Sequence, residues 1–310
     1  MALYNLAASV RQSFRSLSVK NPLPRVAAIH DICGYGRCSL TVAIPILSTM
    51  GFEVSPLPTA ILSTHTLFPN FTILDLTDEL PKIINHWKEL GLKFDAIYSG
   101  FLGSARQVDI VGNFIKDFQG PETLVVVDPV MADHGKLYPT MPPEMVDEMK
   151  KLARISRVIT PNLTEAAFML DRITPETISE KEAKEWLKAL ADMGPEMVVI
   201  TSAPLATRPK SSTVIAYDRV DDRFWITERP HVPTQYHGTG DIFASVLTGS
   251  LLQGDSLPVA MDRSAQFVAT AIRATFGYRE KELGHHEVLL EKALSTLTVP
   301  VKTTTYEPLL

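Results

Sequence analysis

The run Leu-Val-Val-Val at residues 124–127 is followed at once by Asp128 and Pro129. A short, continuous run of apolar β-branched residues predicts a strand that is buried on both faces, as in parallel sheets. Similar runs recur at residues 26–29, 96–98, 157–159 and 197–200. Helical patterns separate them, at about residues 37–50, 78–90, 104–118, 143–153, 163–171 and 180–193. This alternation predicts an α/β fold with a mostly parallel central sheet and helices on both faces.

Two further segments complete the predicted fold. Residues 214–217 and 224–227 flank an acidic turn and predict an antiparallel hairpin at the edge of the sheet. Two apolar helical patterns follow, at about residues 241–253 and 258–276. Because no repeat or linker interrupts the chain after residue 24, we predict a single domain over residues 25–310. No separate lid segment is inserted early in the chain, so no lid domain is predicted.

The overall composition favours a small-molecule function. The chain has 310 residues, of which 45% are hydrophobic, and this is enough for a sizeable core. With 30 basic and 35 acidic residues, the formal net charge is -5, which offers no general attraction to nucleic acid or to an anionic membrane. No apolar run approaches the roughly 18 residues of a membrane-spanning helix. Cys33 and Cys38 predict neither a disulfide framework nor a four-ligand zinc site, which favours a reducing compartment.

Residues 1–24 differ in composition from the rest of the chain. They include several serines together with Arg11, Arg15 and Lys20, and they contain no acidic residue. This composition is typical of an organelle transit peptide, and also of a basic tail or short amphipathic helix that packs on the domain. We favour the second interpretation, and therefore predict a basic N-terminal extension on a cytoplasmic protein, with organelle targeting as the alternative.

Gly238, Thr239, Gly240 and Asp241 stand directly before an apolar helical pattern that starts at residue 242. Glycines at a helix start let a phosphate approach free backbone N–H groups at the positive end of the helix dipole. A carboxylate at that place can accept a hydroxyl proton while the amides stabilise a transferring phosphoryl group. Ordinary capping is the alternative, because glycine turns and Asp are common where helices begin. The pattern alone leaves both interpretations open.

Two other nucleotide-binding devices are missing from the sequence. A P-loop needs G-x-x-x-x-G-K-[ST], and no stretch supplies that lysine. Gly34 and Gly36 begin a dinucleotide fingerprint, but Ser39 occupies the position of its third glycine. The hypothesis of a nicotinamide-dependent oxidoreductase is weakened accordingly.

Polar residues follow the predicted strands, at the edge where ligands of open parallel sheets bind. Asp128 and Asp133 follow residues 124–127, and their carboxylates are candidates for binding Mg²⁺ or polarising a substrate. Asn162 and Glu165 have the spacing of a capping box, in which the Asn caps a helix and the Glu reaches back. They are also candidates for facing phosphates and organising Mg²⁺ through water. Both roles could hold together.

In combination, these motifs resemble those of the ribokinase superfamily. Residues 238–241 resemble its G-[AT]-G-D signature, and Asn162 with Glu165 resembles its N-x-x-E magnesium motif. The resemblance covers about residues 25–280. It implies a three-layer ribokinase-like fold that binds ATP and Mg²⁺, with K⁺ as a possible further ion.

Within that superfamily, the sequence is most similar to the vitamin B6 kinases. The similarity lies in the opening at residues 30–41, in residues 62–66, and around Asp128 and Thr160. It implies transfer of phosphate from ATP to the 5′-hydroxymethyl group of pyridoxal, pyridoxamine or pyridoxine, for vitamin salvage. The resemblance also implies a homodimer.

The resemblance implies a role for each site residue. Asp241 is implied to be the catalytic base, and Gly238, Thr239 and Gly240 are implied to form the anion hole. The residues implied to face ATP and Mg²⁺ are Asp128, Asp133, Tyr138, Thr160, Asn162, Glu165, Thr201 and Ser202, with Asp128 and Glu165 toward the metal. Those implied to contact the vitamer are His30, Asp31, His65, Thr66, Phe101 and Asp241.

Other functions stay open at this point. Hydroxymethylpyrimidine kinases have a related fold and act on a similar heterocycle, but they often have Cys where this chain has Asp241. A noncatalytic protein could use the same fold to sense or store a vitamer, although the intact motifs argue against it. Many pyridoxal kinases have a serine near His30 and Asp31 and a tyrosine at the place of Phe101, so the preferred vitamer is not predicted.

Overall fold

The computed structural model of the protein describes residues 23–234, 236–278, 287–300 and 305–309. Residues 1–22, which make up almost all of the predicted N-terminal extension, lie outside the described residues. The extension and the cytoplasmic location therefore stay predictions. Among the described helices, none combines the length and the apolar character needed to cross a membrane.

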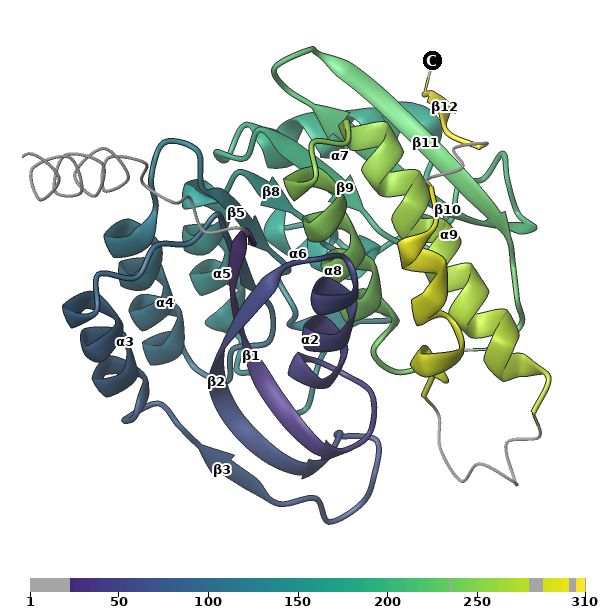
Figure 1. Cartoon of the computed structure of the whole chain (residues 1–310). Helices are drawn as coiled ribbons and strands as arrows, with labels where there is room; N and C mark the ends of the chain where they lie inside the picture. Colours follow the sequence, from purple (N-terminus) through teal and green to yellow (C-terminus); the bar gives the residue numbers. More distant parts are fainter. Residues whose placement is uncertain (1–22, 235, 279–286, 301–304, 310) are drawn as a thin grey trace, which may run out of the picture.

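A ten-stranded sheet forms the centre of the protein (Figure 1). Its middle strands run parallel, in the order β2 (Glu53–Thr64), β1 (Arg25–Tyr35), β4 (Ala96–Ser99), β5 (Leu124–Val127), β8 (Val158–Ile159) and β9 (Met197–Ile200). The antiparallel strands lie outside them and are β10 (Ser211–Asp218), β11 (Arg223–Pro230), β12 (Glu307–Pro308) and β3 (Ile73–Asp75). The α/β fold, the five predicted buried strands and the edge hairpin are confirmed.

Helices cover both faces of the sheet (Figure 1). One layer consists of α3 (Leu80–Glu89), α4 (Ala105–Phe118), α5 (Met145–Ile155), α6 (Leu163–Met169) and α7 (Glu180–Ala191). The other consists of α2 (Leu40–Thr49), α8 (Thr239–Leu252), α9 (Leu257–Phe276), η1 (Leu290–Lys292) and η2 (Leu294–Thr298). Successive strand side chains point to opposite faces, so that Ile97 and Tyr98 belong to two separate apolar cores. The three-layer prediction is confirmed.

The ribbon of β1 and β2 differs most from the sequence-based expectation. β1 continues beyond residues 26–29 to Tyr35, and it stays paired with β2 over this length, with a register shift between His30 and Ile32. β2 was not expected as a strand because Pro56 and Pro58 interrupt its apolar pattern. The ribbon extends past the end of β4 and forms one wall of the cavity described below.

A small hairpin forms a second departure. β6 (Ala132–Asp133) and β7 (Lys136–Leu137) pair antiparallel in the segment that follows β5. Each strand is too short to leave a periodic pattern in the sequence. The hairpin places Asp133 and Tyr138 beside the cavity.

Candidate active site

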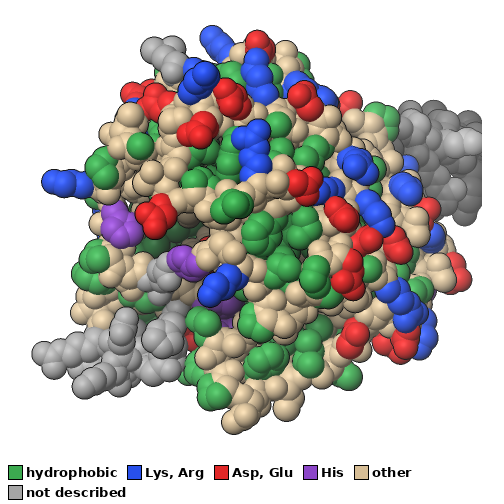
Figure 2. Space-filling view, turned by 180° about the vertical axis from the view of Figure 1, so that it is seen from behind, with side chains coloured by type: hydrophobic (Ala, Val, Ile, Leu, Met, Phe, Trp, Pro, Cys, Tyr) green, Lys and Arg blue, Asp and Glu red, His purple; other side chains and the backbone are tan. Residues whose placement is uncertain are grey.

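A cavity of about 240 Å³ opens at the carboxyl edge of the parallel strands. With His30 as the exception, the predicted site residues line it, namely Asp31, His65, Thr66, Phe101, Asp128, Asp133, Tyr138, Thr160, Asn162, Glu165, Thr201, Ser202, Gly238, Thr239, Gly240 and Asp241. Figure 2 shows a hollow on one face of the molecule, bordered by histidine and acidic side chains. The fold therefore brings together residues that are far apart in the sequence.

The start of α8 forms one end of the cavity. Gly238 precedes the helix with a φ of 78°, and a Cβ at this position would stand 2.2 Å from the carbonyl oxygen of Arg37. Only glycine fits both constraints. Around Gly240, by contrast, no described atom beyond its chain neighbours and the backbone of its own helix lies within 4 Å of the place where a Cβ would stand. Since the first N–H groups of a helix have no intrahelical carbonyl partner, they are available to an anion in this open space.

Asp241 lies in the first turn of α8, and a residue distant in the sequence orients its side chain. Its Oδ2 accepts a hydrogen bond from the backbone N–H of Ser39, at 2.9 Å. The carboxylate is thus held by the segment before α2, an arrangement that ordinary capping of α8 does not explain. Burial raises the pKa of Asp241 to about 7; the Ser39 N–H opposes this rise and the charge of Asp31 adds to it. A carboxylate with a pKa near neutrality suits a general base.

His30 does not line the cavity, so the predicted contact of its side chain with the substrate gains no support from this structure. Its ring is fully buried, 4.4 Å from the ring of Tyr98 between ring centres, and its Nδ1 lies 3.9 Å from Oδ1 of Asp241. Burial lowers the pKa of His30 to about 3, so the ring is neutral behind the carboxylate. The next residue, Asp31, lines the cavity instead.

Asn162 and Glu165 form the predicted capping box of α6. Oδ1 of Asn162 accepts from the N–H of Glu165 at 2.9 Å, and Oε2 of Glu165 accepts from the N–H of Asn162 at 2.8 Å. Oε1 of Glu165 also accepts from the N–H of Met131 at 3.1 Å. Both carboxylate oxygens therefore accept hydrogen bonds from the backbone, which fixes the orientation of the Glu165 side chain.

Asp128 is the second candidate ligand for a cation. It directly follows β5, lines the cavity and accepts a hydrogen bond from Oγ1 of Thr160 at 2.9 Å. Burial, followed by the negative charge of Asp241, raises the pKa of Asp128 to about 8. A cation between the carboxylates of Asp128 and Asp241 would relieve their mutual repulsion. Mg²⁺ prefers carboxylate oxygens as ligands.

The remaining predicted residues lie around the rim and the far wall. Asp133 is half-exposed beside His134, whose backbone N–H it accepts at 2.8 Å. The ring of His65 stacks on that of His237, with 4.5 Å between ring centres. Ser202 follows β9 with a φ of 54°, which turns the chain away after the strand.

Several cavity residues were missed by the sequence reasoning. They include Cys33, Cys38, Ser39, Tyr236 and His237. Most of them flank motifs that the sequence already indicates: three fall in the opening at residues 30–41, and His237 directly precedes the glycines of α8. Their position next to those motifs was the sequence signal that could have placed them in the site.

A family model described as phosphomethylpyrimidine kinase matches residues 86–286, which is more than half of the chain. The chain belongs to the phosphomethylpyrimidine kinase family. The crystal structure, with pyridoxal, of a Bacteroides thetaiotaomicron protein described as a phosphomethylpyrimidine kinase is 52% identical and has a TM-score of 0.88. That match covers 92% of this chain and 99% of the Bacteroides chain.

Two more distant proteins have similar sequences. The crystal structure of pyridoxal kinase from Lactobacillus plantarum is 28% identical with a TM-score of 0.81, and the match covers 89% of this chain and 96% of that one. A pyridoxine/pyridoxal/pyridoxamine kinase from Bordetella bronchiseptica is 28% identical over 87% of this chain and 94% of its own length. The predicted resemblance to vitamin B6 kinases of the ribokinase superfamily is confirmed.

Proposed function

We propose that this protein transfers the γ-phosphate of ATP to the 5′-hydroxymethyl group of a B6 vitamer. One observation carries the proposal. The Asp241 carboxylate and the open first turn of α8 lie together at one end of the cavity. Similar proteins indicate which class of molecule accepts the phosphate. The Bacteroides protein was crystallised with pyridoxal, and the Lactobacillus and Bordetella proteins are kinases of B6 vitamers.

The geometry assigns a task to each part of the site. Asp241, held by Ser39, accepts the proton of the vitamer hydroxyl as its oxygen attacks the phosphoryl group. The N–H groups at Thr239 and Gly240 stabilise the negative charge that develops on the transferred group. Asp31, His65, Thr66 and Phe101 line the part of the cavity that would hold the ring.

The residues present fit an Mg²⁺ ion. Asp128 offers a buried carboxylate, and Glu165 with Asn162 fixes the segment beside it. We therefore propose that Asp128 holds the ion and that Glu165 contributes through water. The ion would neutralise phosphate charge when it is bound with ATP.

An Asp241→Asn variant tests the mechanism. We expect turnover to fall by roughly 10²- to 10⁴-fold, because the amide cannot take the proton, while the KM for ATP stays within a few-fold. Asp147→Asn is the matched control, since Asp147 is exposed on α5. Near-normal turnover of Asp241→Asn would refute the assignment of the base.

The family description itself favours a second candidate, phosphorylation of a hydroxymethylpyrimidine. ATP consumption with the three vitamers, hydroxymethylpyrimidine and ribose separates the candidates. Preference for the pyrimidine over every vitamer would overturn the choice of acceptor and leave the phosphoryl transfer in place. Binding of a vitamer without ATP consumption would support a noncatalytic protein instead.

We also propose a homodimer that buries the apolar surface of β2 and β3. Ile61 and Leu74 are cross-strand partners, and their exposed fractions are 43% and 58%. Ile73, next to Leu74 on the edge strand β3, is 54% exposed. Ile61 and Leu74 lie on one face of the sheet and Ile73 on the other. Exposed apolar side chains on an edge strand favour contact with a second copy of the chain.

A further inference from the structure

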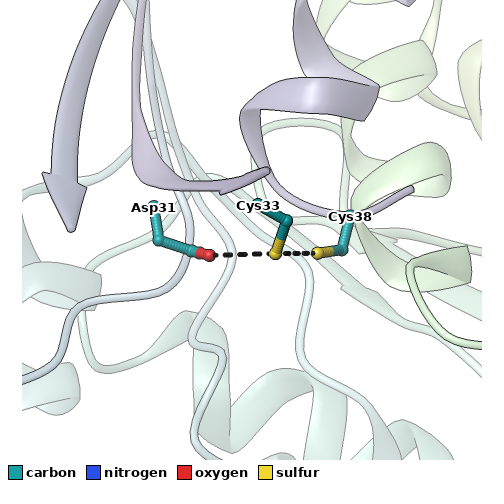
Figure 3. Close-up of side chains that lie close together, drawn as sticks. All are labelled: Asp31, Cys33 and Cys38. Atoms are coloured by element: carbon teal, nitrogen blue, oxygen red, sulfur yellow. Dashed lines mark hydrogen bonds between the residues drawn. The ribbon is translucent and has the colours of Figure 1, made fainter. Parts of the chain in front are cut away.

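Cys33 and Cys38, which have no role in the proposed mechanism, lie beside Asp31 of the ring-binding wall, in the second half of β1 and the turn after it. Ile32 and Ser39 form an antiparallel bridge, which makes Cys33 and Cys38 the next facing pair in the turn between them. Their sulfur atoms are 2.8 Å apart, and Sγ of Cys33 lies 3.6 Å from Oδ2 of Asp31 (Figure 3). One ligand atom from each of the three residues lies within 4.8 Å of the other two.

The surroundings of this cluster favour a cation. Asp31, Cys33 and Cys38 are 4%, 2% and 3% exposed, and all three line the cavity, so a small ion could reach them without unfolding. The described lining of the cavity contains no Lys or Arg, whereas it does contain the Asp241 carboxylate. Negative surroundings attract a cation, and a bound cation in turn stabilises the thiolate form of the cysteines that ligate it.

We propose that Asp31, Cys33 and Cys38 bind a thiophilic divalent cation of the Zn²⁺ type at the acceptor end of the cavity. Two thiolates and a carboxylate form a suitable ligand set, with Zn–S bonds of about 2.3 Å in tetrahedral geometry. Such bonds place two sulfurs roughly 3.8 Å apart, so the thiols need to separate by about 1 Å. Binding releases the two thiol protons to solvent, and the fourth position faces the cavity.

The location of the site has a consequence that rests on the proposed function. Cys38 directly precedes Ser39, whose N–H holds Asp241. A cation on Cys38 and Asp31 occupies the space beside the base and opposes entry of the vitamer. Zn²⁺ therefore inhibits phosphoryl transfer in competition with the vitamer, and not in competition with ATP.

Binding is tested on the full chain with Co²⁺ as the probe, in a phosphine reductant. Because Cys33 and Cys38 are the only cysteines of the sequence, any thiolate-to-Co²⁺ absorption band reports this site. We expect one Co²⁺ per chain, displaced by Zn²⁺. Cys38→Ser and Cys38→Ala should both lose most of the band, and Asp147→Asn should keep it.

The results of these experiments distinguish the proposed metal site from the proposed inhibition by Zn²⁺. Absence of the band in the reduced wild-type chain, or recovery of a Cys33–Cys38 disulfide without metal uptake, would overturn the site. A full band in both Cys38 variants would overturn it as well. If the band forms and Zn²⁺ leaves turnover with saturating MgATP unchanged, the site stands and the inhibition is wrong. The binding measurement needs no kinase activity, so failure of the proposed function is distinguishable.

Discussion

Replacing Gly238 and Gly240 separately by Ala tests the anion hole, because the two glycines differ in their surroundings. At Gly238, the new methyl group would meet the carbonyl oxygen of Arg37 at 2.2 Å, and its φ of 78° is unfavourable for any L side chain. At Gly240, the methyl group would enter open space in the cavity. The first substitution therefore acts on the fold, and the second acts on the ligand.

The two substitutions should change the free energy of unfolding in opposite directions. A left-handed conformation costs a non-glycine residue about 1–2 kcal/mol, before the contact with Arg37 is relieved. In contrast, Ala in place of Gly within a helix stabilises by up to about 1 kcal/mol. We therefore expect the free energies of unfolding of Gly238→Ala and Gly240→Ala to differ by roughly 2–3 kcal/mol.

Turnover should fall in both variants. In Gly240→Ala, the methyl group keeps the phosphate from the first amides of α8, and removal of such a donor costs on the order of 10²-fold in kcat. Urea denaturation and steady-state kinetics of each variant check both expectations. Full activity of Gly240→Ala would refute the anion hole, and equal stability of the two variants would refute the close approach of Arg37.

Three further predictions concern pH, the α6 cap and assembly. Because burial raises the pKa of Asp241 from 3.8 to about 7, its proton stabilises the folded state below pH 3.8, and this contribution is lost as pH rises through 7. Turnover should rise over that range while the free energy of unfolding falls; a flat pH–rate profile would contradict this. Glu165→Gln leaves one buried N–H opposite an amide group, so denaturation should show a loss of about 1–3 kcal/mol, whereas Glu182→Gln, in the exposed capping box of α7, should change stability little. Leu74→Asp should shift sedimentation to the monomer, and an unchanged dimer would place the contact elsewhere.

The sheet and its helices were predictable because their signals are local. Continuous apolar runs gave the central strands, and the periods of three to four residues gave the helices, including α8 and α9. β2 was not predicted because Pro56 and Pro58 break its apolar pattern. In the structure, pairing with β1 on one side and β3 on the other stabilises the strand. Pairing with neighbours that are distant in the sequence decided its conformation.

The membership of the site was predictable, whereas its contacts were not. Asp128 and Asp241 could be placed at the cavity because strand ends and helix starts meet at one edge of the sheet. The hydrogen bond from Ser39 to Asp241 could not, since it joins residues 202 positions apart. The one-residue register around His30 and Asp31 also depended on the bulge between β1 and β2. Such details follow from packing across elements, which no short pattern encodes.

The contact between the segment before α2 and the start of α8 also has a consequence for biosynthesis. The ribosome completes β1 through β11 before Gly238 and Asp241 have been added to the nascent chain. Until then only the core beneath α3 to α7 can start to form, because the core of the other layer includes side chains of α8 and α9, and neither base nor anion hole exists. A translation product that terminates before α8 is therefore inert toward ATP, and the proposed kinase becomes competent only when late residues dock against early ones.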